Sequence, residues 1–283
     1  MPALCRLKSK AAVYSIVNTA QQLKEGMGVK IWAGYNGRNS LVFEGYISRI
    51  GYSIPLQIEC ECYSYLLRRN TFNASYRNAT VRQVLLDAIK GTPILLHPAT
   101  VDVNMGATRF NGNANALQVL DWLKRNMMRV YFVGNKLYAG IEMLPVTGTV
   151  RYRLNYNTVS DNNLHFGPKP PVTINISPEL KASNGTRKRG GHDAPGKKVK
   201  RVALQYTQAQ LDKVAHEANK QQELKGFEGT LEAFLEPMAQ VGMAADIEDT
   251  RYPERNGKYF IEAIEGSLSQ SGGRLNIKLG GRL

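Results

Sequence analysis

The chain has 283 residues, of which 43% are hydrophobic, and this is enough for one large domain or for two to three small domains with cores of their own. No apolar run approaches the roughly 18 residues that a membrane-spanning helix needs, which excludes a transmembrane helix. The 37 basic and 23 acidic side chains give a net charge of +14, which indicates an anionic partner but says nothing about the fold.

Polar side chains interrupt any apolar core in the first twenty residues. This argues against a signal peptide, and we expect the protein to remain in the compartment where it is made. The cysteines, Cys5, Cys60 and Cys62, are odd in number, which is ordinary in a reducing cytosol. Cys60 and Cys62 lie two residues apart, which predicts a buried, inert pair on one face of a strand. We expect no metal site there, because no second Cys or His pair stands at ligand spacing.

The first predicted element is a β-hairpin over residues 26–50. Its two strand-forming runs are separated by the turn cluster Asn36–Asn39. Trp32, in the first of these runs, is expected to be a core or interface anchor. Strand character continues through residues 56–67 after a turn-prone stretch.

From Thr80 onward the pattern changes from strand to helix. Thr80 is suited to cap the N-terminus of a helix whose apolar residues recur at helical spacing until Gly91. A second helix is predicted over residues 115–127, and a hairpin across Gly134 and Asn135 follows it. The stretch is therefore typical of a mixed α/β unit.

Strand character returns between residues 150 and 180, followed by a basic segment that predicts a mobile loop. Thr207 is suited to cap a helix over about 208–224. A second hairpin, over residues 259–283, closes the chain with strict alternation of apolar and polar residues. Neither hairpin contains a nucleophile, a metal cluster or a phosphate loop, which favours a function performed by surfaces rather than by chemistry.

Basic side chains concentrate between residues 181 and 201. This segment contains a single acidic residue, Asp193, and half of the net charge of the chain. Candidate contacts to a partner or to phosphate are Lys181, Arg187, Lys188, Arg189, Lys197, Lys198, Lys200 and Arg201. The segment is either a solvated or partner-docking loop that is ordered in an assembled ring, or a phosphate-contacting loop. It contains no aromatic residue, so stacking on bases is not available to it.

Three short motifs resemble parts of catalytic sites, but each lacks a necessary feature. His216-Glu217 begins like the zinc-protease motif, yet Lys220 stands where the second histidine is needed. Residues 51–55 resemble a nucleophile elbow in which a proline replaces the final glycine. His192-Asp193 follows two glycines in a predicted loop, which is poor support for catalytic geometry. We therefore expect no enzyme activity, no catalytic or metal-binding residue and no cofactor.

Several stretches follow one another in a characteristic order: GxxVKIWAGYNG, LVFEGYISRI, IECECYSYLL, ALQVLDWLKRNMMRVYFVGNKLYAG, RNGKYFIEAIE and GGRLNIKLG. This order resembles the baseplate hub proteins of phage tails, including the late control protein D family and the Mu hub. The resemblance extends from about Gly26 to the end of the chain. Its specificity comes from the order, because no single motif is diagnostic.

The resemblance implies an α+β, mainly β fold with two β-barrel-like domains and an α/β insertion. The expected spans are 1–69 for the first barrel-like domain, 70–150 for the insertion, and 151–283 for the second barrel-like domain, which includes the basic segment and the following helix. Only about 25 residues precede the first predicted hairpin. The first domain is therefore expected to be abbreviated, and later strands or a neighbouring subunit could complete it.

The resemblance also implies a structural role. The subunit would form a homotrimeric ring that adapts the six-fold tail tube to a three-fold spike, with the tail tube protein and the spike protein as partners. It would be located in the tail or baseplate of the virion after assembly in the bacterial cytoplasm, with transient contact to DNA in the tail channel. Two alternatives remain open: a nucleic-acid-binding β-barrel protein that uses residues 181–201, and a wall-degrading enzyme, against which the lack of a placed acid–base pair counts.

Overall fold

A computed structural model describes residues 6–11, 23–51, 56–110, 114–160, 163–167, 173–178, 198–223, 226–269 and 272–283. Strands account for 52% of these residues and helices for 19%, so the predicted fold class, α+β and mainly β, is confirmed. The chain forms two compact units, and both are discontinuous in sequence. Unit 1 consists of Met1–Pro2, Leu66–Leu144 and Pro168–Lys225, and unit 2 consists of Ala3–Tyr65, Pro145–Gly167 and Gly226–Leu283. The three domain spans expected from the sequence stay predictions.

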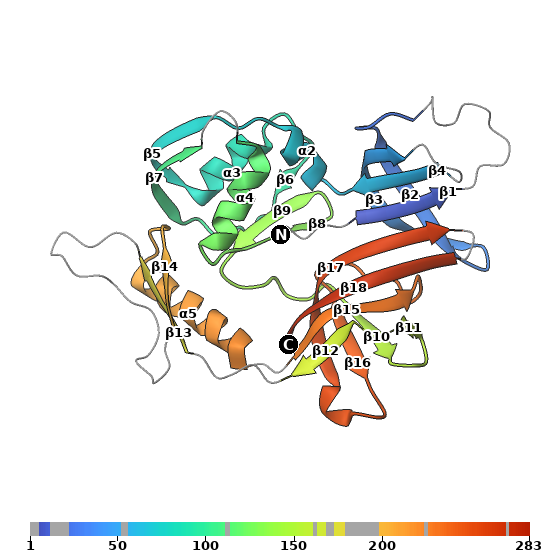
Figure 1. Ribbon diagram of the computed structural model, residues 1–283. Coiled ribbons are helices and arrows are strands. Elements are labelled where there is room, and N and C mark those ends of the chain that lie inside the picture. Colours follow the sequence, from blue (N-terminus) through green and yellow to red (C-terminus); the bar gives the residue numbers. More distant parts are fainter. Residues whose placement is uncertain are drawn as a thin grey trace. The chain divides into compact units, whose positions relative to one another are not determined.

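Unit 2 is built on an eleven-stranded, curled sheet (Figure 1). Its strands are β1 (Arg6–Ala11), β2 (Gly28–Tyr35), β3 (Arg38–Gly51), β4 (Leu56–Glu61), β10 (Thr149–Arg153), β11 (Thr158–Ser160), β12 (Leu164–Gly167), β15 (Gly226–Phe234), β16 (Ala244–Glu248), β17 (Gly257–Ser269) and β18 (Gly272–Arg282). The main path runs β11-β15-β18-β17-β1-β4-β3-β2. Off this path, β12 pairs with β15, and β16 pairs with both β17 and β10.

Both predicted hairpins are confirmed, as β2–β3 and β17–β18. The turn between β2 and β3 places Asn36 and Gly37 at φ values of 54° and 77°, in the left-handed region that these two residue types tolerate. Strand β1 pairs antiparallel with β4 and parallel with β17. It therefore joins the two hairpins, which lie far apart in sequence, into one continuous sheet.

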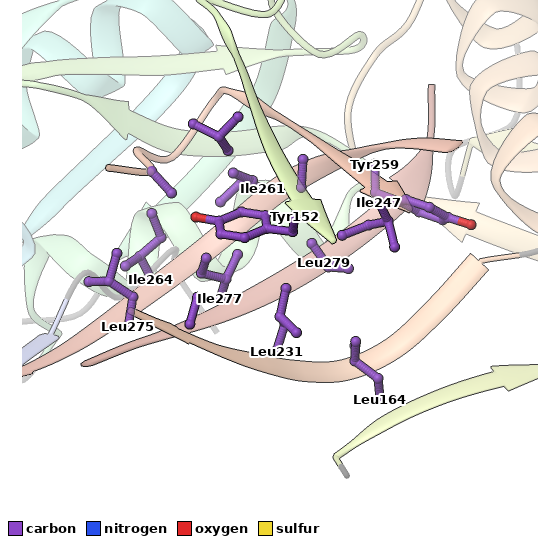
Figure 2. Close-up of a cluster of buried hydrophobic side chains, with 14 of the residues drawn as sticks. Tyr152, Leu164, Leu231, Ile247, Tyr259, Ile261, Ile264, Leu275, Ile277 and Leu279 are labelled. Carbon is purple, nitrogen blue, oxygen red and sulfur yellow. The ribbon is translucent and has the colours of Figure 1, made fainter. Parts of the chain in front are cut away.

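Two clusters of buried side chains stabilise unit 2. The larger one gathers residues of β10 and β15 to β18, and Figure 2 shows the ring of Tyr152 among the side chains of β17 and β18. The Tyr152 hydroxyl donates a hydrogen bond of 3.1 Å to the carbonyl of Pro237, so this buried polar group is satisfied. The smaller cluster is formed by Phe43, Ile47 and Cys60. Val42 packs against both clusters and so connects them.

Unit 1 combines helices with three small sheets. The helices are α3 (Val81–Ile89), α4 (Ala116–Arg125) and α5 (Gln208–Glu223), and α2 (Ser64–Arg69) runs into the unit from unit 2. The sheets are β5 (Ala74–Thr80) with β7 (Asn104–Phe110); β6 (Leu95–Leu96), β9 (Lys136–Gly140) and β8 (Arg129–Val133); and β13 (Ile174–Pro178) with β14 (Lys198–Val202). Within the described ranges, no helix combines the length and apolarity required to cross a membrane.

The predicted starts of α3 and α4 are confirmed, because a capping hydrogen bond is present at each. The Thr80 hydroxyl accepts a hydrogen bond of 3.3 Å from the backbone N–H of Gln83 at the start of α3. The Asn115 side chain accepts one of 3.2 Å from the N–H of Gln118 at the start of α4. Gly91, which follows α3, has a φ of 76°. The side chains of Thr80 and Asn115 thus satisfy backbone N–H groups at the starts of α3 and α4, and a glycine follows the end of α3.

The strand expected over residues 56–67 is wrong in its second half. Strand β4 ends at Glu61, and α2 begins at Ser64. The Ser64 hydroxyl donates a hydrogen bond of 2.8 Å to the Glu61 carboxylate, and both side chains are buried. This buried pair turns the chain, and the leucines and arginines that follow favour a helix.

The strand expected at the start of the 150–180 region is divided by a turn. Strand β10 ends at Arg153, and the Asn157 side chain accepts a hydrogen bond of 2.7 Å from the Arg153 N–H. Asn155 adopts a φ of 64° in this turn, before β11 begins. Side-chain oxygens of asparagine compete in this way with strand pairing, so the alternating pattern alone overestimates the strand.

Candidate interaction surfaces

The β2–β3 hairpin exposes a group of large apolar side chains, which we name the hairpin surface. Its members are Met27, Trp32, Tyr35 and Leu41, with exposed fractions of 43%, 57%, 40% and 37%. Trp32 and Leu41 lie directly opposite each other in the register of the two strands. A group of this kind is typical of interaction sites, because single scattered apolar residues, rather than several within one hairpin, are usual on free surfaces.

The other set of alternating positions in β2 faces the core. Val29 and Ile31 pack against the smaller buried cluster. The set that contains Trp32 otherwise holds Gly28, Lys30 and Gly34, so Trp32 is its one large apolar side chain. Tyr35 belongs to the same set as Val29 and Ile31 and is exposed at the end of the strand. The ammonium of Lys30 lies 3.1 Å from the carboxylate of Glu44 on β3.

β2 also lies at an end of the sheet. Among the strands that the structure describes, it pairs with β3 only. The far edge of such a strand presents backbone N–H and C=O groups that can pair with a further strand. The hairpin surface thus combines exposed aromatic side chains with a sheet edge.

The edge at β10 has a different character. Among the described strands, β10 pairs with β16 only. Its Arg151 and Arg153 donate hydrogen bonds of 2.6 Å and 2.8 Å to the two carboxylate oxygens of Glu248 on β16. These bonds, the one from Arg153 first, hold the pKa of Glu248 below its usual value. Charged side chains at an edge discourage pairing with other strands.

The basic segment is described only at its C-terminal end. Lys198, Lys200 and Arg201 are exposed on β14, which we name the basic strand. The remaining candidate contacts, Lys181, Arg187, Lys188, Arg189 and Lys197, lie outside the described residues. The loop prediction for 181–201 is wrong for residues 198–201, which form a ladder with β13 in parallel register.

Side-chain amides connect the basic strand to the rest of unit 1. Asn219 of α5 accepts a hydrogen bond of 2.6 Å from the N–H of Ile174 in β13 and donates one of 3.0 Å to its carbonyl. Beyond β14, the Asn126 side chain accepts a hydrogen bond of 2.6 Å from the N–H of Ala203. The Tyr206 hydroxyl donates one of 3.0 Å to the Asn126 carbonyl. The two-stranded sheet is therefore attached to α5 along β13 and to Asn126 just beyond the end of β14.

The net charge is divided unequally between the two units. In the sequence, unit 1 holds 22 basic and 9 acidic residues, for a net charge of +13. Unit 2 holds 15 basic and 14 acidic residues, for a net charge of +1. The anionic partner that the composition indicates is therefore expected at unit 1, whereas unit 2 is close to neutral.

The described residues contain no group of three or more His, Cys, Asp or Glu side chains placed to hold a metal ion. Cys60 and Cys62 are buried free thiols, and burial raises the pKa of Cys60 to about 11. His216 lies exposed on α5. The His192-Asp193 pair and residues 52–55 lie outside the described ranges.

Sequence reasoning missed most of the hairpin surface. It singled out Trp32 as an anchor but gave no role to Tyr35 or Leu41. The alternation gave no signal for them, because Trp32 shares its set of positions with Lys30 and two glycines, and Tyr35 falls in the set with Val29 and Ile31. The division of charge between the units could not be found from the sequence either, since each unit is assembled from separate segments.

The fold formed by these elements is that of phage tail proteins. No protein-family model matches the chain, and no curated protein sequence matches it. Solved structures do share its architecture, and they include tail proteins of phages and prophages and a component of a type VI secretion system. The resemblance to tail hub proteins is thereby confirmed at the level of the fold.

Three of these structures illustrate the likeness. The tail protein from Neisseria meningitidis MC58 has a TM-score of 0.57 and 15% identity, over 85% of this chain and 80% of that one. The 43 kDa tail protein of prophage MuSo2 from Shewanella oneidensis has a TM-score of 0.58 and 10% identity, over 98% and 88%. An E. coli type VI secretion component, described as structurally similar to T4 bacteriophage tail proteins gp27 and gp5, has a TM-score of 0.54 and 12% identity, over 89% and 63%.

Proposed function

We propose that this chain is a structural subunit of a phage tail or of a related injection particle. In this proposal three copies form a ring, the baseplate hub, that adapts the six-fold tail tube to a three-fold spike. Its partners are further copies of itself, the tail tube protein and the spike protein. It is located in the tail or baseplate of the virion and assembles in the bacterial cytoplasm.

The observation that carries the proposal is the extent of the shared fold. The likeness to the prophage MuSo2 tail protein covers 98% of this chain, so it includes both units rather than one common module. The exposed hairpin surface and the edge of β2 support a role in assembly, because a subunit of a larger particle needs surfaces for its neighbours.

The role we propose is not enzymatic. The buried thiol of Cys60 supports this, because a pKa of about 11 keeps it protonated and unreactive near neutral pH. The exposed His216 supports it as well, because Lys220 occupies the position one turn later where the zinc-protease motif needs its second histidine ligand.

The test is the symmetry and the partners of the purified protein. We expect negative-stain images to show a ring with three-fold symmetry, and we expect the chain to co-purify with the tail tube protein when both are produced together. A protein that stays monomeric and fails to bind the tube protein would contradict the hub role.

A second candidate function is favoured by the basic strand. Lys198, Lys200 and Arg201 are exposed together on β14, in the unit that carries nearly all of the net charge. A nucleic-acid-binding protein would use them with the rest of residues 181–201. If all eight cations of the segment contacted phosphates of duplex DNA, log affinity against log salt would fall with a slope of roughly −7. Gel shifts at several salt concentrations measure this slope, and a steep slope from a monomer would favour DNA binding over the hub.

A further inference from the structure

We propose that an acidic, extended segment of a partner protein docks along the outer edge of the basic strand, β14, and adds a strand to its sheet. Among the described strands, β14 pairs with β13 only. The juxtaposition that carries the inference is this sheet edge beside three exposed cations and an exposed apolar residue. The inference goes beyond the hub role, since it does not depend on the ring.

The backbone groups of β14 alternate in direction. The N–H of Lys198 donates a hydrogen bond of 2.7 Å to the carbonyl of Thr173, so the backbone groups of Lys198 point toward β13. Those of Lys200, two residues later, do the same in the parallel register. The N–H and C=O groups of Val199 and Arg201 therefore point away from β13, toward the outer edge.

Side-chain amides occupy the neighbouring edge positions of this sheet. Asn126 accepts a hydrogen bond of 2.6 Å from the N–H of Ala203, which is the next outward-pointing position after Arg201. Asn219 takes up both backbone groups of Ile174 at the opposite edge. Among the described residues, none does the same for Val199 or Arg201. These two residues therefore present donors and acceptors that a further strand can use.

The side chains of the basic strand indicate what such a strand carries. Lys198 and Lys200 share one face of β14, and Val199, which is 48% exposed, shares the other face with Arg201. An added strand would place a side chain opposite each of these residues, and opposite charges in such pairs are stabilising. Acidic residues at alternate positions, with an apolar residue between them, therefore match this edge.

The same features favour a protein segment over nucleic acid at these residues. The cations lie on both faces of the strand, whereas a phosphate backbone that lies against one face reaches only part of them. The outward carbonyl groups would repel phosphate oxygens, but an added strand donates N–H groups to them. Val199 can pack against an apolar side chain and has no hydrogen bond to offer a phosphate.

The first experiment tests whether the partner pairs as a strand. The probe is a fluorescent heptapeptide of alternating glutamate and valine with capped ends, titrated with the full chain and followed by anisotropy. When its glutamates lie opposite Lys198 and Lys200, its valine amides face the outward groups of β14. A second peptide carries N-methyl groups on these valine amides, so it keeps the charge but cannot donate the hydrogen bonds. We expect it to bind at least about tenfold more weakly.

The second experiment uses two double variants that change the net charge equally. Lys198→Glu with Lys200→Glu reverses the charge on one face of β14. Lys90→Glu with Lys136→Glu is the control, because both lysines are exposed elsewhere in unit 1. We expect the first pair to weaken binding of the unmodified peptide at least about tenfold and the control to change it less than about twofold. Circular dichroism and urea unfolding check that both variants are folded.

Four results would overturn the inference. One is a peptide that does not bind at any concentration, and another is equal binding of the N-methylated peptide, because charge alone would then suffice. Peptide binding that survives the change at Lys198 and Lys200 would place the contact elsewhere. Duplex DNA that binds more tightly than the peptide, and loses this binding in the same double variant, would assign the cations to nucleic acid. The hub role is tested separately, by the symmetry of the purified protein and by its binding to the tail tube protein.

Discussion

The side-chain amide of Asn219 in α5 makes both backbone hydrogen bonds of Ile174 in β13, one as acceptor at 2.6 Å and one as donor at 3.0 Å. A neighbouring strand would normally satisfy these two groups. The helix therefore replaces a third strand beside β13 and β14, and it fixes the sheet that carries the basic strand.

Replacing this amide should release the sheet from the helix. We expect Asn219→Ala to lower the free energy of unfolding by about 2 kcal/mol, since two hydrogen bonds of roughly 1 kcal/mol each are lost. Lys220→Ala, at the exposed neighbouring position, should change it by less than about 0.5 kcal/mol. Urea unfolding and hydrogen exchange at the Ile174 amide measure both effects. Equal stability of the two variants would show that the amide contributes nothing.

Gly45 in β3 should not tolerate a side chain. A Cβ atom there would lie 2.3 Å from the backbone oxygen of Glu61 and 2.7 Å from the ring of Phe43. We expect Gly45→Ala to cost about 3 kcal/mol of folding free energy, because β4 or the ring must move. Gly28→Ala is the control in the same hairpin, since nothing lies within 4 Å of its Cβ position. If the two variants unfold at the same urea concentration, the close packing of β3 against β4 is wrong.

The network at β10 should make stability depend on acid pH. Because hydrogen bonds from Arg153 and Arg151 lower the pKa of folded Glu248, its contribution is present above its unfolded pKa of about 4.3. That contribution is lost as the pH falls through the folded pKa. The difference in stability between the natural chain and Glu248→Gln should therefore be constant from about pH 5 to 7 and shrink in stronger acid. Urea unfolding at a series of pH values measures it, and a difference that stays constant down to pH 2 would argue against the network.

The thiol of Cys60 should be unreactive in the folded protein. Reaction with disulfide reagents requires the thiolate, and burial raises the pKa of Cys60 to about 11. In a chain with Cys5→Ala, we expect no labelling under native conditions and labelling of Cys60 and Cys62 after denaturation. Since an unfolded thiol ionises near pH 8.5, the stabilisation from burying the neutral thiol should be lost as the pH rises from there toward 11. Rapid labelling of the native chain would show that this part of the core opens.

Several features of the fold follow from short stretches of sequence. The Asn36-Gly37 turn, the caps at Thr80 and Asn115, and the alternation in the closing hairpin are local, since the groups that interact lie within a few residues of one another. The order of these elements was also sufficient to indicate the fold of the tail proteins. These are the features that hydrophobic pattern and residue propensity can predict.

Other features depended on contacts that no local pattern contains. The turn at Glu61 and Ser64 ends a strand that the sequence pattern extends, because the hydrogen bond between these buried side chains stops it. The strand character of residues 198–202 depends on β13, which lies about twenty residues earlier in the sequence. Their pairing further relies on Asn219 and Asn126, each from a different helix region.

The sequence by itself determined that the chain is mainly β, with one hairpin near residues 26–50 and another at 259–283. It also determined where the helices begin and where the basic residues concentrate, and it contained no complete catalytic motif. Only the tertiary structure decided that β1 joins the two hairpins into one sheet and that β2 lies at its edge. It also decided that Trp32 faces solvent rather than a core. The physical reason is that exposure and edge position depend on which strands pair across the whole chain, whereas turns, caps and alternation depend on neighbours in sequence.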